Sequence, residues 1–274
     1  MSDAVRHAVA ELAGDLRAWL EYAEDTGAEF LPWEPPRPRQ QARTQTHPPQ
    51  EAQPQGAPPQ SRPPQTRPQT RPPQSRPRTQ PGGGSPARAS QGAALDAVRA
   101  ELGECTRCGL HEGRRHIVFG VGNSSAEIVV VGEAPGRDED LTGEPFVGRS
   151  GQLLTRMLQA IGVAREDAYI CNVLKCRPPR NRDPEPNEIA TCSPFMAKQI
   201  EAIGPKVIIT SGRFASQSVL GLELSMGKMR GTIRSFQGVP VVPMYHPAYL
   251  LRNPAAKRQA YEDLLMVKSI ISEG

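Results

Sequence analysis

Four short apolar runs, each followed by a loop and then by a stretch with helical spacing, recur along the second half of the chain. The runs are EIVVVGE (127–133), AYICNVL (168–174), KVIIT (206–210) and VPVVPMY (239–245). The stretches with helical spacing are 151–162, 187–203, the residues up to Leu220, and 255–271. Short apolar strands that alternate with helices predict a mostly parallel sheet covered on both faces. We therefore expect an α/β fold, a three-layer α/β/α sandwich with a mostly parallel four-stranded sheet, over residues 92–274.

The preceding residues differ in composition and divide into two parts. Residues 1–34 hold eight Asp or Glu against two Arg, with apolar residues at helical spacing, and predict an acidic amphipathic helix. Residues 35–91 hold nine Arg, one Glu and an approximate repeat, PPQSR, PPQTR, PQTR and PPQSR. Proline at this density supplies few backbone donors and little apolar area, so we expect a disordered linker. The apolar stripe of the helix is expected to pack against the main domain, with docking of a partner as the alternative. The linker is expected to be an inert spacer, with tethering to DNA through its Arg side chains or docking of a partner as the alternatives.

No run of about 20 apolar residues is present, which predicts no membrane span, and the N-terminus does not resemble an export signal. We therefore expect a cytoplasmic protein, and cysteines in a reducing compartment more often bind metal than form disulfides. Cys105 and Cys108 form a C-x-x-C pair, and Cys176 and Cys192 flank the loop after the second strand. Four such thiolates suit either a tetrahedral zinc ion or an iron–sulfur cluster, and their spacing does not choose between them. Cys171 lies within a strand and is predicted to be a buried apolar residue.

Three segments resemble the family 4 uracil-DNA glycosylases, which are thermostable-type enzymes with a [4Fe–4S] cluster. They are GEAPGRDEDLTGEPFVGRSGQLL (132–154), YICNVLKCRPPRNRDPEPNE (169–188) and MYHPAYLLRN (244–253). The resemblance implies a uracil-DNA glycosylase-like fold and a structural [4Fe–4S] cluster on Cys105, Cys108, Cys176 and Cys192. It also implies hydrolysis of the bond between uracil and deoxyribose in single- or double-stranded DNA, which leaves an abasic site.

Each requirement of that reaction has a candidate residue. By the resemblance, Phe146 stacks on the extruded uracil, and Gly132 and Ala134 belong to the base-binding residues. Asn172 can donate to uracil O4 and accept from N3–H, whereas cytosine presents the opposite pattern. His246 is expected, as a neutral imidazole, to donate to uracil O2 as charge develops there, a contribution of roughly 3–4 kcal/mol.

The water that attacks the sugar has no obvious activating residue. Ala134 stands where the best-known uracil glycosylases carry Asp, so only its backbone can take part. The nearby carboxylates are Glu133 and Glu139. We predict that Glu133 positions the water and that Glu139 forms the pocket wall near uracil C5, where it excludes the methyl group of thymine.

Other residues of these segments are candidates for DNA contact. Ser150 and Ser211 each lie near a predicted helix start, where backbone amides can hold a phosphate, although plain helix caps explain them equally well. Leu250 and Leu251, beside Arg252, are predicted to form an apolar wedge that fills the space left by the extruded nucleotide.

The sequence thus predicts a monomeric, nucleoid-associated DNA repair glycosylase without a diffusible cofactor. Two alternatives stay open. One is a relative that traps the abasic sugar covalently through a His-bearing insert, although the loop 177–186 contains no His. The other is a cluster-containing DNA-binding protein without enzymatic activity.

Overall fold

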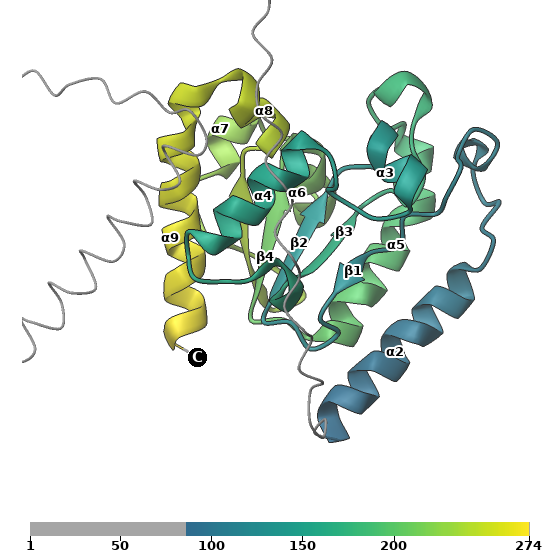
Figure 1. Ribbon diagram of the computed structural model, residues 1–274, viewed down its shortest axis with the longest axis horizontal. Coiled ribbons are helices and arrows are strands. Elements are labelled where there is room, and N and C mark those ends of the chain that lie inside the picture. The colour runs from purple at the N-terminus through teal and green to yellow at the C-terminus, as the bar shows by residue number, and fades with distance from the viewer. Residues whose placement is uncertain (1–85, 274) are drawn as a thin grey trace, which may run out of the picture. The chain divides into compact units, whose positions relative to one another are not determined.

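The computed structural model describes residues 86–273. The helix predicted in residues 1–34 and most of the linker predicted in 35–91 lie outside these residues. Within the described part, a six-stranded sheet has the order β1-β3-β2-β4-β6-β5 (Figure 1). The four inner strands pair in parallel, as predicted, but an antiparallel strand flanks them at each edge. The prediction of a four-stranded sheet is therefore wrong in strand number and correct for its parallel centre.

The bounds of the elements follow the predicted alternation. The strands are β1 (Val121–Gly122), β2 (Ile128–Gly132), β3 (Tyr169–Asn172), β4 (Val207–Ser211), β5 (Arg234–Phe236) and β6 (Val239–Met244). The α-helices are α2 (Pro86–Leu102), α3 (Arg137–Thr142), α4 (Arg149–Gln159), α5 (Pro186–Ile203), α6 (Arg213–Leu220), α7 (Met226–Met229), α8 (Pro247–Arg252) and α9 (Lys257–Glu273). Short 3₁₀ helices are η1 (Gly109–His111), η2 (Arg165–Asp167), η3 (Pro179–Asn181) and η4 (Pro254–Ala256).

Alternate residues of the inner strands point to opposite faces and enter two separate cores. Ile128 and Val130 of β2 face the core that contains residues of α4, α8 and α9. Val129 and Val131 face the core that contains residues of α5 and α6. Because strands buried on both faces must be apolar throughout, β2 reads as a continuous apolar run rather than an alternating one. The predicted α/β/α layering is confirmed.

Helix α2 begins at Pro86, before the predicted domain boundary at residue 92. It runs beside α5 (Figure 1), where Val98 and Leu102 share a small core with Phe195. The side chain of Gln91 also donates a hydrogen bond of 2.7 Å to the carbonyl of Ile203 at the end of α5. The folded domain therefore includes residues that composition assigned to the linker.

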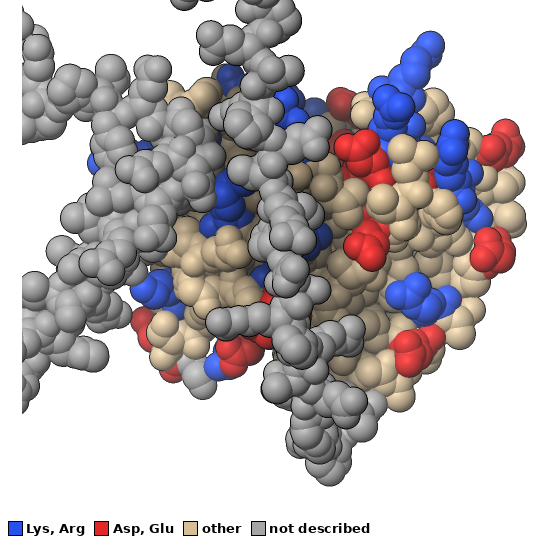
Figure 2. Space-filling model, in the orientation of Figure 1, with Lys and Arg blue, Asp and Glu red and all other residues tan. Residues whose placement is uncertain are grey.

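The surface charge is mixed. Basic and acidic side chains are interspersed over the uncovered part of the face seen in Figure 2. This agrees with the near balance of 22 basic and 20 acidic residues in 92–274. Among the described residues, no helix is long and apolar enough to cross a membrane.

All four inner strands end at the same edge of the sheet, because they run in parallel. Gly132 at the end of β2 pairs with Asn172 at the end of β3, and Ser211 pairs with Met244. The loops that follow these residues carry the motifs found in the sequence. Ligands of open α/β sheets bind at this edge, so the fold places the candidate residues where a site is expected.

Candidate active site

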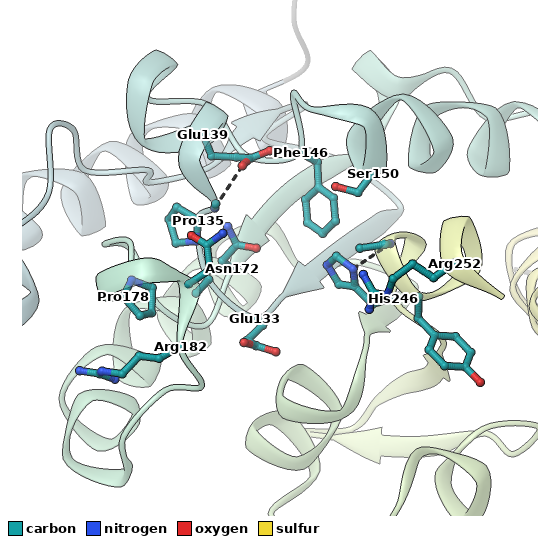
Figure 3. A pocket seen from close by; sticks show the side chains of 15 residues that line it. Glu133, Pro135, Glu139, Phe146, Ser150, Asn172, Pro178, Arg182, His246 and Arg252 are labelled. Atoms are coloured by element: carbon teal, nitrogen blue, oxygen red, sulfur yellow. Dashed lines mark hydrogen bonds between the residues drawn. The ribbon is translucent and has the colours of Figure 1, made fainter.

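A cavity of about 420 Å³ opens at the carboxyl ends of the strands (Figure 3). The predicted residues Glu133, Ala134, Glu139, Phe146, Ser150, Asn172, His246 and Arg252 all line it. In Figure 3 Asn172 lies on one side of the cavity, Phe146 and His246 lie on the other, and Glu133 lies between them. We call this space the base cavity.

Phe146 is held in an unusual backbone conformation. Its φ angle is 54°, which non-glycine residues rarely adopt, and its side chain is buried. Helix α4 approaches so closely that a Cβ atom at Gly151 would collide with the Phe146 carbonyl. The guanidinium of Arg165 donates a hydrogen bond of 2.8 Å to the preceding carbonyl, that of Pro145. Contacts on both sides of Phe146 therefore fix its ring, which lies 5.6 Å from that of His246 between centroids.

Asn172 enters the cavity beside the end of β2. It is 2% exposed, and its carboxamide makes no hydrogen bond with another described residue. A Cβ atom at Gly132 would overlap its Oδ1 atom and would lie 2.6 Å from Cε2 of Phe146. Gly132 therefore does not itself line the cavity, but its missing side chain lets both groups reach it. The carboxamide is left with its donor and acceptor available to a ligand.

His246 presents one defined ring nitrogen to the cavity. Burial, assisted by the charge of Arg252, lowers the pKa of His246 to about 4, so the ring is neutral near pH 7. The backbone N–H of Ala248 donates to Nδ1 at 3.1 Å. The proton of the neutral ring must then lie on Nε2, which becomes a hydrogen-bond donor. This agrees with the neutral imidazole predicted from the sequence.

Glu133 has a perturbed acidity. Burial raises the pKa of Glu133 to about 7; the charge of Asp183 raises it further and Arg213 opposes the shift. A carboxyl group with this pKa can take up or release a proton near neutral pH. Ala134 follows it and exposes only backbone and a methyl group to the cavity.

The carboxylate of Glu139 is occupied by the backbone. Its Oε2 atom accepts from the N–H of Gly136 at 3.1 Å, and Oε1 accepts from Val147 and Gly148 at 3.0 and 3.3 Å. These bonds tie the turn after β2 to the loop that carries Phe146. A carboxylate that already accepts three backbone hydrogen bonds has fewer acceptor positions left for a water, which leaves Glu133 as the freer candidate.

The predicted DNA contacts divide into two groups. Ser150 and Arg252 line the base cavity, whereas Leu251 is half-buried and lines only a second, adjoining cavity. Leu250, in contrast, is 0% exposed and packs in the core, so its prediction as part of an apolar wedge is wrong. Ser211 is 2% exposed, and its buried hydroxyl has no hydrogen-bond partner among the described residues, so its contact with a phosphate stays a prediction.

A second space of about 470 Å³, the outer cavity, adjoins the base cavity and shares Ser150, Asn181 and Arg252 with it. The side chains of Arg137 and Arg149 also line the outer cavity, and both residues are exposed. Tyr249 at the rim of the base cavity is 38% exposed and stacks on Tyr245 at 4.9 Å between ring centroids. The sequence interpretation gave no role to Arg137 and named Tyr249 only as the first residue of the segment 249–252, although both lie within the quoted motifs.

The loop between β3 and α5 contributes residues that the sequence interpretation also missed. Pro178, Asn181 and Arg182 line the base cavity. Arg182 forms two hydrogen bonds, of 2.9 and 2.6 Å, with the buried carboxylate of Glu188 in α5. The sequence did offer one indication that this loop is functional, because it lies between Cys176 and Cys192, two predicted metal ligands.

The four predicted metal ligands, Cys105, Cys108, Cys176 and Cys192, line one small cavity, which we call the cysteine cavity. Cys176 and Cys192 belong to the core that also contains residues of α5 and α6. Leu102, Ile117 and Phe195 supply apolar walls. Arg114 donates to Cys176 Sγ, and the backbone N–H of Lys175 donates to Cys192 Sγ, both at 3.3 Å. Within residues 86–273, no three His, Cys, Asp or Glu side chains are close enough to ligate a single metal ion. Cys171 is buried in the core, as predicted.

Comparison with known proteins gives one consistent result. The model of the uracil DNA glycosylase superfamily matches residues 119–266. A type-4 uracil-DNA glycosylase of Archaeoglobus fulgidus is 49% identical over 62% of this chain and 88% of its own length. Proteins of the same name from Thermotoga maritima and Saccharolobus solfataricus are 48% and 44% identical, over 95% and 87% of their lengths and 65% of this chain in each case.

Proposed function

Because the chain belongs to the type-4 family of the uracil DNA glycosylase superfamily, we propose that it excises uracil from DNA by hydrolysis of the N-glycosidic bond. The reaction adds water to the C1′ carbon of the sugar and releases uracil, so that an abasic site remains in the strand. The observation that carries the proposal is the base cavity, where Phe146, Asn172, His246 and Glu133 surround one space. These side chains supply a stacking surface, a base-reading carboxamide, a neutral donor and a titratable carboxylate.

Base selection rests on Asn172. Its carboxamide donates to uracil O4 and accepts from N3–H, and both of its polar ends are available for this. Cytosine places a donor and an acceptor at the opposite positions, so its binding leaves buried polar groups unpaired. Discrimination of that kind reaches several powers of ten. Phe146 holds the plane of the base, which must leave the DNA stack to enter the cavity.

The leaving group is stabilised by His246. As the glycosidic bond breaks, negative charge spreads over the uracil ring, and the Nε2–H of His246 donates to its O2 atom. The ring needs no change of protonation for this task because its low pKa keeps it neutral. A preorganised donor in a water-poor site stabilises the transition state more than the ground state.

The attacking water is positioned by Glu133. Its carboxylate, ionised above pH 7, accepts a proton as the water adds to the sugar, and its charge also stabilises an oxocarbenium-like sugar. Glu139 contributes indirectly, because its three backbone bonds hold the water-binding turn against the loop of Phe146. We therefore assign Glu139 a positioning role in addition to the wall near uracil C5.

The DNA strand on either side of the extruded uridine follows the outer cavity. Arg137, Arg149 and Arg252 are exposed there and can bind phosphates, with Ser150 at the shared rim. Leu251, which lines the outer cavity, and the exposed ring of Tyr249 are proposed to fill the gap in the duplex in place of the buried Leu250. Both single- and double-stranded uracil-DNA fit this arrangement.

A structural [4Fe–4S] cluster suits the cysteine cavity better than zinc does. The preference rests on the resemblance to the type-4 uracil-DNA glycosylases and on the four cysteines that line this cavity. A cubane takes each of four thiolates on a different iron atom. When bound, it would link α2 and the start of the domain to the loop that carries Arg182, and its chemistry would be structural.

The remaining assignments follow from the substrate. A monomer with one base cavity is sufficient for the reaction, and the protein acts in the cytoplasm where the nucleoid lies. A contact with DNA or with a protein through residues 1–91, most of which lie outside the described residues, stays a prediction.

The test is incubation of the coloured, purified protein with uracil-containing single- and double-stranded oligonucleotides, followed by alkali. We expect strand breaks at uracil positions only after the alkali treatment. Breaks without alkali would indicate lyase activity, a protein–DNA adduct would indicate covalent trapping, and intact strands would refute glycosylase activity.

A further inference from the structure

Lys175 is a fully buried lysine that the proposed reaction does not use. Its side chain is 1% exposed, and its ammonium group donates to the backbone carbonyl of Asn172 at 2.7 Å and to Oε1 of Gln199 at 2.6 Å. Burial of an ammonium group is costly unless it is well hydrogen-bonded. These two bonds therefore hold the lysine in place, and it in turn holds their acceptors.

One end of this arrangement reaches the base cavity. Asn172 is the last residue of β3, and its side chain reads the base while its carbonyl accepts from Lys175. The amide of Gln199 is itself fixed, because its Nε2 atom donates to the carbonyl of Phe119 at 2.9 Å and to the hydroxyl of Tyr169 at 3.0 Å. The position of the Asn172 backbone is thus set by a chain of buried hydrogen bonds anchored in α5.

The other end reaches the cysteine cavity. Lys175 lines that cavity and directly precedes Cys176, and its backbone N–H donates to Sγ of Cys192 at 3.3 Å. Its carbonyl accepts from the N–H of Val118 at 2.8 Å. One residue therefore contacts the residue that reads the base and a predicted cluster ligand.

We propose that Lys175 is a positioning residue that holds Asn172 in register with the base and thereby links the cysteine cavity to base recognition. This inference rests on the proposed function, since it assigns Asn172 its role as base reader. Loss of the ammonium group leaves the Asn172 carbonyl and Gln199 Oε1 without their donor, and the end of β3 shifts to find new partners. A displacement of about 1 Å near the reacting groups can cost roughly 100-fold in rate.

The experiment measures single-turnover uracil release by the cluster-loaded protein carrying Lys175→Met, Asn172→Ala or both. Methionine has nearly the length of lysine but no donor. We expect Lys175→Met to slow release roughly 100-fold, with unchanged visible absorbance and unchanged affinity for DNA that contains an abasic analogue. In the Asn172→Ala background the same change should cost nothing further, because residues that act as a unit are not additive. Lys198→Met is the matched control, since Lys198 is exposed on the same helix as Gln199 and pairs with Glu101.

An equal loss in both backgrounds would overturn the proposal, because Lys175 would then act independently of Asn172. If Lys175→Met loses the cluster, Gln199→Met decides, since Gln199 does not line the cysteine cavity. We expect the Gln199→Met variant to keep its colour and to release uracil roughly tenfold more slowly, but only where Asn172 is present. A native rate of uracil release by this variant would refute the role proposed for Lys175. Failure of the native protein and of Lys198→Met to release uracil would instead refute the proposed function.

Discussion

The base cavity and the cysteine cavity share no lining residue and differ in size and polarity. The base cavity has a volume of about 420 Å³, and the carboxamide of Asn172 and Nε2 of His246 keep hydrogen-bonding capacity there for a ligand. The cysteine cavity is small and apolar, and two of its four sulfur atoms already accept hydrogen bonds. A site that must bind and release a substrate needs unsatisfied polar groups, whereas a site that orders loops needs permanent partners. The difference assigns the chemistry to the first region and the architecture to the second.

The largest effect on activity without an effect on stability is expected from Glu133→Gln in the base cavity. The variant keeps the shape of the base cavity but loses the proton acceptor, so uracil release should fall by roughly 10²- to 10⁴-fold with native thermal stability. In the native protein, the rate should rise with pH through about 7, because Glu133 works in its ionised form. His246, with a pKa of about 4, is already neutral in that range. A native pH profile without this step, measured under single-turnover conditions, would contradict the assignment.

A smaller loss of activity is expected from His246→Ala, which removes the donor to uracil O2. Loss of one such donor costs roughly 10²- to 10³-fold in rate. Binding of DNA that contains an abasic analogue should be unaffected, since no leaving group is then present. Single-turnover kinetics and fluorescence anisotropy measure the two quantities, and equal losses in both would argue for a role in DNA binding instead.

Cys176→Ser in the cysteine cavity should, in contrast, lower the stability of the protein more directly than its activity. The loss of a structural ligand is expected to reduce the visible absorbance near 400 nm and to cost more than about 4 kcal/mol of folding free energy. Cys171→Ala is the control, because Cys171 is also buried but does not line the cysteine cavity. Denaturant unfolding and the absorbance ratio test this pair, and a colourless, zinc-loaded native protein would refute the cluster.

Leu250→Ala and Leu251→Ala separate core packing from DNA contact. Leu250 is fully buried, so its truncation should cost about 2–5 kcal/mol of stability. Leu251→Ala should leave stability nearly native and reduce activity on double-stranded more than on single-stranded uracil-DNA. A Leu250→Ala variant with native stability would contradict the burial of Leu250 in the core.

The smallest effect is expected from Arg252→Gln. It should weaken DNA binding only a few-fold and reduce the slope of log affinity against log salt concentration by about one. Lys198→Met, far along α5, should leave that slope unchanged. An unchanged slope for Arg252→Gln would remove Arg252 from the phosphate contacts.

The sequence predicted the parallel core well, because strands buried on both faces form continuous apolar runs that periodicity detects. It missed β1 and β5, which have two and three residues and carry no periodic signal. The cysteines of the cysteine cavity and most of the polar residues of the base cavity could be named from motifs, since the chemistry requires those residue types. The roles of Glu139 and Leu250 could not be predicted. The sequence does not show whether a carboxylate faces a cavity or binds backbone N–H groups, or whether an apolar side chain is exposed or packs in the core. The role of Lys175 could not be predicted for a similar reason, since only the fold shows that its side chain points inward.

The most direct test of the account is the measurement of free uracil released when the native protein is mixed in excess with an oligonucleotide that holds one uracil. The account predicts one uracil per strand, with no release of cytosine or thymine from matched oligonucleotides and no release by Glu133→Gln on the same timescale. Absence of free uracil with the native, coloured protein would contradict it.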